Sequence, residues 1–194
     1  MSDFADDDHS RVVNHILAPP VGTFQLDPVH TFVAFRAQHL VVGRVRGRFE
    51  DVKGTIVVAE DLTESSVDVE IGTASVTTLN ADRDDDMRSE HYLDVTRYPT
   101  MTFRSTHAAE ATSGIWIVTG DLTVHGVTRS VELPVTFGGS TTDAYGNMRL
   151  SFHTETSITR KDYGLTYELL KEAGNMLVGK DIAIEIDAEA IRPQ

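Results

Sequence analysis

The chain has 194 residues, a length that suits one domain, and 40% of them are hydrophobic, which is enough for a packed core. Its formal net charge is -13, so its surface repels phosphate backbones and we expect no nucleic-acid partner. The absence of cysteine excludes disulfide frameworks, thiol nucleophiles and cysteine-ligated metal centres. No stretch approaches the roughly 18 apolar residues of a transmembrane helix, so we expect no stable membrane insertion.

The N-terminal segment differs in composition from the rest of the chain. It is polar, rich in aspartate, and ends at Pro19 and Pro20. We expect a flexible acidic arm over residues 1–21 and a single domain over residues 22–194. The apolar residues of the arm suffice only for a short amphipathic turn: Val12, Val13, Ile16 and Leu17. The arm lacks the basic start and the run of roughly 7–15 apolar residues of a signal peptide, so we expect a cytoplasmic protein.

From Phe24 onward, apolar and polar residues alternate with a period of two in many short runs. The runs are separated by glycine-containing turns. This pattern is typical of antiparallel strands that bury one face and expose the other. The alternating apolar positions include Val33, Phe35 and Ala37, then Ile56 and Val58, then Val67, Val69 and Ile71, then Met101 and Phe103, then Leu122 and Val124, then Val131, Leu133, Val135 and Phe137, and finally Ile182, Ile184 and Ile186.

Two stretches depart from the alternation. Residues 79–95 offer Asn80 or Asp82 as an N-cap and carry acids in the first turn, so we expect a helix there. Residues 163–173 form either a second, shorter helix or an irregular crossing. About eight strands with one or two short helices predict an all-β fold, an antiparallel barrel whose closure leaves no exposed edges.

Several short motifs occur together and in a fixed order along the chain. They are Asp27-Pro28 with His30-Thr31, Gly47-Arg48-Phe49, Arg83-Asp84, Tyr98-Pro99-Thr100-Met101-Thr102-Phe103, the run from Thr119 to Thr128, and Arg160 with Asp162-Tyr163-Gly164. In this order they resemble the YceI-like family of polyisoprenoid-binding proteins. The resemblance extends over residues 24–191. It implies an extended, lipocalin-like barrel with a lengthwise apolar tunnel for an isoprenoid chain, no known catalytic machinery, and a homodimer as a candidate assembly.

A tunnel for a long chain needs apolar walls, because each buried CH₂ group contributes about 0.8 kcal/mol to binding. The alternative is that the same side chains fill a solid core, and alternation alone does not distinguish a filled barrel from a hollow one. The family resemblance favours the hollow barrel. The candidate lining residues are Val33, Phe35, Ile56, Val58, Val69, Met101, Phe103, Leu122, Val135 and Phe152.

Three polar residues are candidates for contact with a ligand head group. His39 ends a strand, where it is either a hydrogen-bonded histidine or a polar contact near the tunnel mouth. Arg83 and Arg160 each have a nearby aspartate, so each either clamps a loop through bidentate hydrogen bonds or meets a phosphate or quinone oxygen. The histidines have no metal-ligand spacing, and the acidic run at residues 84–86 lacks the spacing of a calcium loop, so we expect neither a metal nor a cofactor.

These observations favour binding, sequestration or transport of a polyisoprenoid or other long apolar lipid, such as a quinone or polyprenyl precursor. One alternative is an enzyme that acts on a similar apolar molecule, with His39, Arg83 or Asp84 as acid–base groups. Another is an interaction module with a filled barrel, which a cavity too small for a chain would favour.

Overall fold

The computed structural model describes residues 8–13, 15–40, 42–112, 114–167 and 178–192, and these residues are mostly in strands. The strands are β1 (Arg11–Val13), β2 (Ile16–Ala18), β3 (Gly22–Leu26), β4 (Phe32–His39), β5 (Gly43–Phe49), β6 (Val52–Val58), β7 (Ser66–Gly72), β8 (Val76–Thr77), β9 (Thr100–Thr112), β10 (Ile115–Val124), β11 (Val127–Thr142), β12 (Met148–Thr159) and β13 (Val178–Arg192). The helices are α1 (Ala81–Arg88) and the 3₁₀ turns η1 (Leu62–Glu64), η2 (Thr73–Ser75) and η3 (Arg160–Tyr163).

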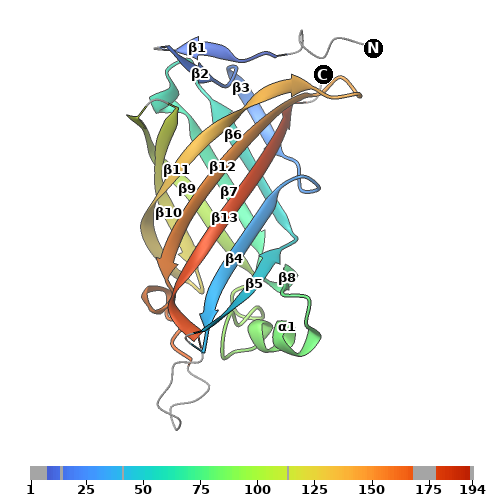
Figure 1. Cartoon of the computed structure of the whole chain (residues 1–194), viewed down its shortest axis with the longest axis vertical. Coiled ribbons are helices and arrows are strands. Elements are labelled where there is room, and N and C mark those ends of the chain that lie inside the picture. The colour runs from blue at the N-terminus through green and yellow to red at the C-terminus, as the bar shows by residue number, and fades with distance from the viewer. Residues whose placement is uncertain (1–7, 14, 41, 113, 168–177, 193–194) are drawn as a thin grey trace.

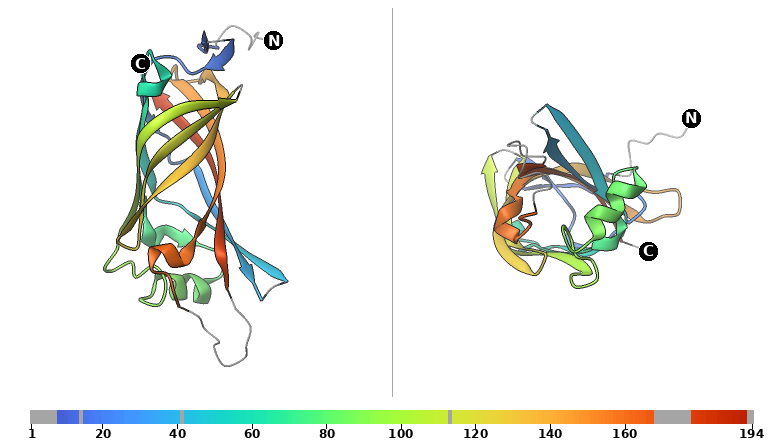
Figure 2. Two further views of the ribbon diagram at one scale, coloured as in Figure 1. Left: turned by 90° about the vertical axis from the view of Figure 1, so that its left-hand side faces the viewer. Right: turned by 90° about the horizontal axis from the view of Figure 1, so that it is seen from below.

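Eight strands close into an antiparallel barrel (Figures 1 and 2), which confirms the predicted fold class. Their order is β12-β11-β10-β9-β7-β6-β3-β13. The barrel closes where β12 pairs with β13, in an unbroken register from Met148↔Arg192 to Thr159↔Asp181. The turn between β10 and β11 consists of His125 and Gly126, both with positive φ (51° and 73°), which matches the twist of a tight hairpin.

Strand β13 pairs with β12 along one edge and with two different strands, β3 and β4, along the other. Near its end, Ala190 and Ile191 pair with β3. Its first part pairs with β4, which carries β5 and then β8 beside it. As a result, the β4–β5 hairpin flares away from the barrel wall at the lower end of the molecule (Figure 2). Only two residue pairs join β5 to β8, Arg48↔Thr77 and Phe49↔Val76.

The core has an upper and a lower part. Phe24, Leu150 and Ala190 are almost wholly buried in the upper cluster, and Tyr163 and Met101 belong to the lower one. Both clusters consist largely of inward-facing strand residues, as the alternation predicts. No helix in the described part of the chain is long and apolar enough to cross a membrane.

The helix predicted over residues 79–95 is real but shorter, because α1 ends at Arg88. Its predicted N-cap is confirmed: the Asn80 side chain accepts a hydrogen bond from the backbone N–H of Arg83, at 3.0 Å. After Ser89 the chain turns, which brings Leu93 into a buried position. Of the residues 163–173, Gly164 ends η3 in the left-handed conformation, and residues 168–173 lie outside the described ones.

The expectation of an arm without fixed structure is wrong for residues 11–13 and 16–18, which form strands. Strands β1 and β2 form a hairpin over the upper end of the barrel (Figure 1). The Arg11 guanidinium fixes it, donating to the carbonyls of Pro19 (2.9 Å) and Ala59 (2.6 Å). Ala18 is 1% exposed and Val13 packs against the same core cluster, so the segment docks on the barrel through these two residues, while Val12 stays exposed. The division into an arm and a domain at residue 21 stays a prediction.

Candidate ligand-binding cavity

The upper half of the barrel contains a cavity of about 210 Å³. The N-terminal hairpin contributes Leu17 to its wall, and η1 contributes Leu62. The rest of the wall consists mainly of aliphatic and aromatic strand residues, including Val33, Val52, Ile56, Val58, Val67, Val69, Phe103, Trp116, Val118, Leu133, Val135, Phe137, Phe152 and Ile186. A wall of this kind binds ligands by burying apolar surface.

The lower half contains a larger cavity, of about 690 Å³. This volume lies within the range of roughly 300–1,000 Å³ that small-molecule sites occupy. Helix α1 and the chain that follows it form one side, and the flared β4–β5 hairpin forms another. The apolar wall residues include Phe35, Val45, Phe49, Met87, Leu93, Met101, Val124, Leu165 and Ile182, and polar groups gather near the hairpin tip and α1.

The two cavities adjoin at the middle of the barrel. Four aliphatic residues belong to the walls of both: Val33, Leu122, Ile158 and Ile184. They come from β10, β12, β13 and β4, which follow one another around the sheet with only β11 between the first two. The interior therefore contains two adjoining apolar spaces, one above the other along the barrel, and the barrel is not the filled one of the alternative interpretation.

Every residue proposed from the sequence as a ligand contact lies in one of these walls. The upper wall contains Val33, Ile56, Val58, Val69, Phe103, Leu122, Val135 and Phe152. The lower wall contains Phe35, His39, Arg83, Met101 and Arg160. Their contact with a ligand stays a prediction. Trp116, Phe137 and Ile184 were not among the candidates, although the alternation along their strands could have indicated them.

Two glycines make room for aromatic rings that line the cavities. A Cβ on Gly47 would lie 2.4 Å from the ring of Phe35, and one on Gly120 would lie 2.5 Å from the ring of Phe103. Any larger residue would therefore displace the ring or the strand. The shape of the interior thus depends on the absence of side chains at these positions as well as on the lining residues.

The two candidate arginines have structural partners. The buried Arg160 donates to the backbone carbonyls of Gly179 (3.0 Å) and Leu165, and so joins η3 to the start of β13. Arg83 does not pair with Asp84: both residues bind Thr78, Arg83 through its Nε (2.7 Å) and Asp84 through hydrogen bonds from the Thr78 hydroxyl and N–H. The sequence predicts a direct bond between arginine and aspartate, whereas in the structure Thr78 links the two residues.

Among the described residues, the His39 ring has no hydrogen-bond partner. It lies in the lower wall beside Gly43, at the end of β4. This placement agrees better with His39 as a polar contact near the mouth of the tunnel than with His39 as a hydrogen-bonded histidine at a strand end.

Comparison with known proteins decides the family. The model of the YceI-like domain matches residues 24–190, most of the chain. The chain belongs to the YceI-like family. Among YceI-like relatives, a UPF0312 protein of Pectobacterium atrosepticum is 34% identical over 170 residues, which cover 87% of this chain and 85% of that protein. The protein YceI of Shigella flexneri is 39% identical over 141 residues, covering 72% and 73%.

Solved structures of YceI-like proteins have the same fold. A Campylobacter jejuni YceI protein superimposes with a TM-score of 0.67 at 26% identity and covers 81% of this chain and 90% of its own. A polyisoprenoid binding domain from Saccharophagus degradans superimposes with a TM-score of 0.68 at 18% identity, covering 88% and 98%. At 18% identity, the similarity to the Saccharophagus domain is a similarity of fold alone.

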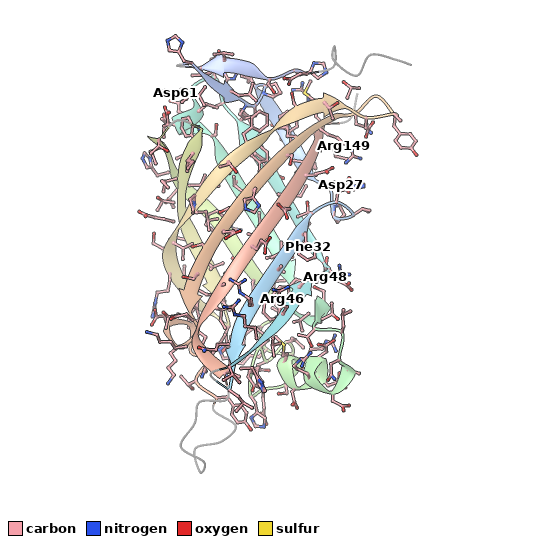
Figure 3. All side chains as sticks on the ribbon, viewed as in Figure 1. Asp27, Phe32, Arg46, Arg48, Asp61 and Arg149 are labelled. Atoms are coloured by element: carbon pink, nitrogen blue, oxygen red, sulfur yellow. The ribbon has the colours of Figure 1, made fainter. Side chains whose placement is uncertain are left out.

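The YceI-like motif around Asp27 has a structural role outside the cavities. The Asp27 carboxylate accepts a hydrogen bond from Arg149 at 2.6 Å (Figure 3). It also accepts one from the N–H of Val29 (3.0 Å), and the His30 ring lies 2.7 Å away. Burial alone would raise the pKa of Asp27, but these hydrogen bonds outweigh burial and lower it to about 2. Asp27, His30 and Glu189 lie close enough together to hold a metal ion, but the Arg149 guanidinium already forms ion pairs with both carboxylates.

Proposed function

We propose that this protein binds a long apolar lipid of the isoprenoid class lengthwise in the barrel, and that it sequesters or carries that lipid. The observation that carries the proposal is the pair of adjoining apolar cavities, whose walls share Val33, Leu122, Ile158 and Ile184. A chain passing through both parts would bury its CH₂ groups at about 0.8 kcal/mol each. The Saccharophagus domain of the same fold, named for polyisoprenoid binding, supports the choice of ligand class.

Binding agrees better than catalysis with the environment of Asp84, one of the acid–base candidates. Asp84 is 6% exposed, and its carboxylate accepts hydrogen bonds from Thr77 and Thr78. Burial would raise its pKa, but these bonds outweigh burial and lower the pKa, which favours a fixed carboxylate over a proton shuttle. Asp84 belongs to neither cavity wall, in contrast to its neighbour Arg83.

The first experiment is lipid mass spectrometry on protein purified natively from its own host. We expect a stoichiometric isoprenoid or quinone. Protein that is free of lipid and also fails to take up added polyprenyl chains would refute the proposal.

The junction of the cavities gives a sharper test. Leu122→Trp places a bulky ring where the two parts meet, so we expect long chains to be lost while chains short enough for the lower cavity still bind. Leu122→Met conserves volume and serves as the matched control, with unchanged chain-length preference. If Leu122→Trp binds long and short chains like the parent protein, the ligand does not pass the junction.

Two further features rest on the sequence and the family resemblance. We propose a cytoplasmic place of work, which cell fractionation tests, and a homodimer, which light scattering on the purified protein tests. Neither is needed for the binding function.

A further inference from the structure

The β4–β5 hairpin is a basic element on an acidic protein. Between Asp27 and Glu50 the sequence contains no aspartate or glutamate, while the whole chain carries a net charge of -13. The hairpin contributes four arginines: Arg36, Arg44, Arg46 and Arg48. At about 0.1 M salt, charges are screened beyond roughly 10 Å, so a partner at this surface meets the nearby charges rather than the net charge. These are the four arginines and, beside Arg44 in the wall of the lower cavity, Asp82 and Asp86 of α1.

All four arginines are exposed, on the face of the hairpin that points away from the barrel interior. Arg46 and Arg48 are seen there in Figure 3. Arg36 lies directly opposite Arg46 in the register, a like-charge arrangement that disfavours the hairpin by itself. Arg48 pairs with Glu50 at 2.6 Å. Within the described part of the chain, Arg36, Arg44 and Arg46 have no carboxylate within 4.0 Å.

Exposed aliphatic side chains accompany these arginines. Leu40 and Val42, at the tip of the hairpin, are 42% and 93% exposed. Leu79 is 91% exposed and lies beside Arg46 and Arg48 in the wall of a groove of about 450 Å³. Glu155 and Glu185 also line this groove, so two acids face its three arginines.

The hairpin also forms part of the wall of the lower cavity. Gly43 and Arg44, directly after the tip, belong to the wall of that cavity. The flared position of the hairpin at the lower end of the barrel projects the tip away from the acidic body of the molecule (Figure 2). A surface that touches the tip is therefore next to the cavity.

We propose that the β4–β5 hairpin docks the protein on a lipid bilayer that contains anionic phospholipid. The arginines bind lipid phosphates, and Leu40 and Val42 enter the interfacial region of the bilayer. A nucleic acid would satisfy the arginines but offers no apolar phase for an aliphatic tip, which is why the bilayer fits better. The inference goes beyond the proposed function and does not depend on which molecule occupies the barrel.

Vesicle flotation tests the proposal, with vesicles of phosphatidylcholine alone and vesicles in which a fraction is replaced by phosphatidylglycerol. We expect the full-length protein to float only with the phosphatidylglycerol vesicles at low salt, and to be released as salt is added. Arg36→Gln with Arg46→Gln should weaken binding roughly 25-fold, since each arginine near the surface is worth about 1 kcal/mol. The same double variant should not lose thermal stability, because it removes a like-charge pair.

The matched control is Lys53→Gln with Arg104→Gln, which removes the same charge from exposed positions on β6 and β9. We expect its vesicle binding to stay within about twofold of the parent protein. Val42→Ser should weaken binding while leaving its salt dependence unchanged.

Several outcomes overturn the proposal: no flotation with phosphatidylglycerol vesicles, an equal loss in the control variant, or binding to a DNA duplex without binding to vesicles. Lipid mass spectrometry on the same samples keeps the two proposals apart. A protein that floats but carries no apolar lipid contradicts only the carrier function. A protein that carries lipid but does not float contradicts only the docking surface.

Discussion

Thr154 is a polar residue in an apolar wall. Its register with Val135 and Ile186 directs its side chain into the upper cavity. The Oγ1 atom is buried and has no hydrogen-bond partner among the described residues. A buried hydroxyl without a partner costs about 1–3 kcal/mol, so this atom is suited to meet an oxygen of a bound ligand.

Thr154→Val replaces this hydroxyl with a methyl group of similar size. For protein without ligand we expect the free energy of unfolding to rise by about 1 kcal/mol, measured by urea denaturation. Thr73→Val is the matched control: Thr73 is also buried, but its hydroxyl donates to the carbonyl of Tyr98 at 2.7 Å, so this variant should lose stability. A loss of stability in both variants would mean that the Thr154 hydroxyl has a partner in solution.

At the scale of residues, the sequence predicts which side chains face the interior but not which polar groups meet. The lining follows from the period of two, which is a local property. The bond between Arg149 and Asp27 joins residues 122 positions apart, and no local pattern indicates it. No local pattern indicates why residue 47 is a glycine either, because the reason is the ring of Phe35, which lies on the neighbouring strand.

Among the elements, α1 covers the lower cavity and supplies Arg83 and Met87 to its wall. Its placement depends on Thr78, which binds both Arg83 and Asp84, and on the Asn80 cap. The cap could be predicted because the capping residue precedes the helix directly. The end of the helix could not be predicted, because it depends on the burial of Leu93, and distant strands form that buried environment.

Asn80→Ala removes the capping acceptor, and we expect it to lower the free energy of unfolding by about 1 kcal/mol. Asn80→Asp keeps an acceptor at the same place and should retain most of the stability. Thermal unfolding followed by circular dichroism measures both. Equal stability of Asn80→Ala and the parent protein would show that Thr78 alone fixes the helix.

For the whole molecule, the network around Arg149 predicts how stability depends on pH. Asp143 resembles Asp27: burial would raise its pKa, but hydrogen bonds from Asn147, Tyr145 and Arg149 outweigh burial and lower the pKa to about 2. Both values lie below the usual 3.8, so the unfolded chain takes up protons first as the pH falls. The stability from these carboxylates is complete above about pH 4 and is lost progressively toward about pH 2.

Arg149→Gln should lower the free energy of unfolding at neutral pH by about 3 kcal/mol, because it leaves partly buried carboxylates without their cation. It should also flatten the loss of stability between about pH 4 and pH 2, since the folded pKa values then rise toward those of the unfolded chain. Urea denaturation at several pH values measures both effects. The exposed Arg129→Gln is the control, and an equally steep pH dependence in Arg149→Gln would exclude this network as its cause.

The position of β13 has a consequence for how the chain folds during synthesis. This strand comprises residues 178–192, follows all the other described strands in the chain, and pairs with β12, β3 and β4. Until it is made, β3 and β4 lack a neighbour on one side, and the barrel stays open with its apolar interior in water. Such unpaired edges invite aggregation, and contacts between distant parts of a chain form slowly. We therefore expect the nascent chain to need protection from aggregation until β13 has been made, and a chain truncated before residue 178 to aggregate or be degraded rather than fold into a shorter barrel.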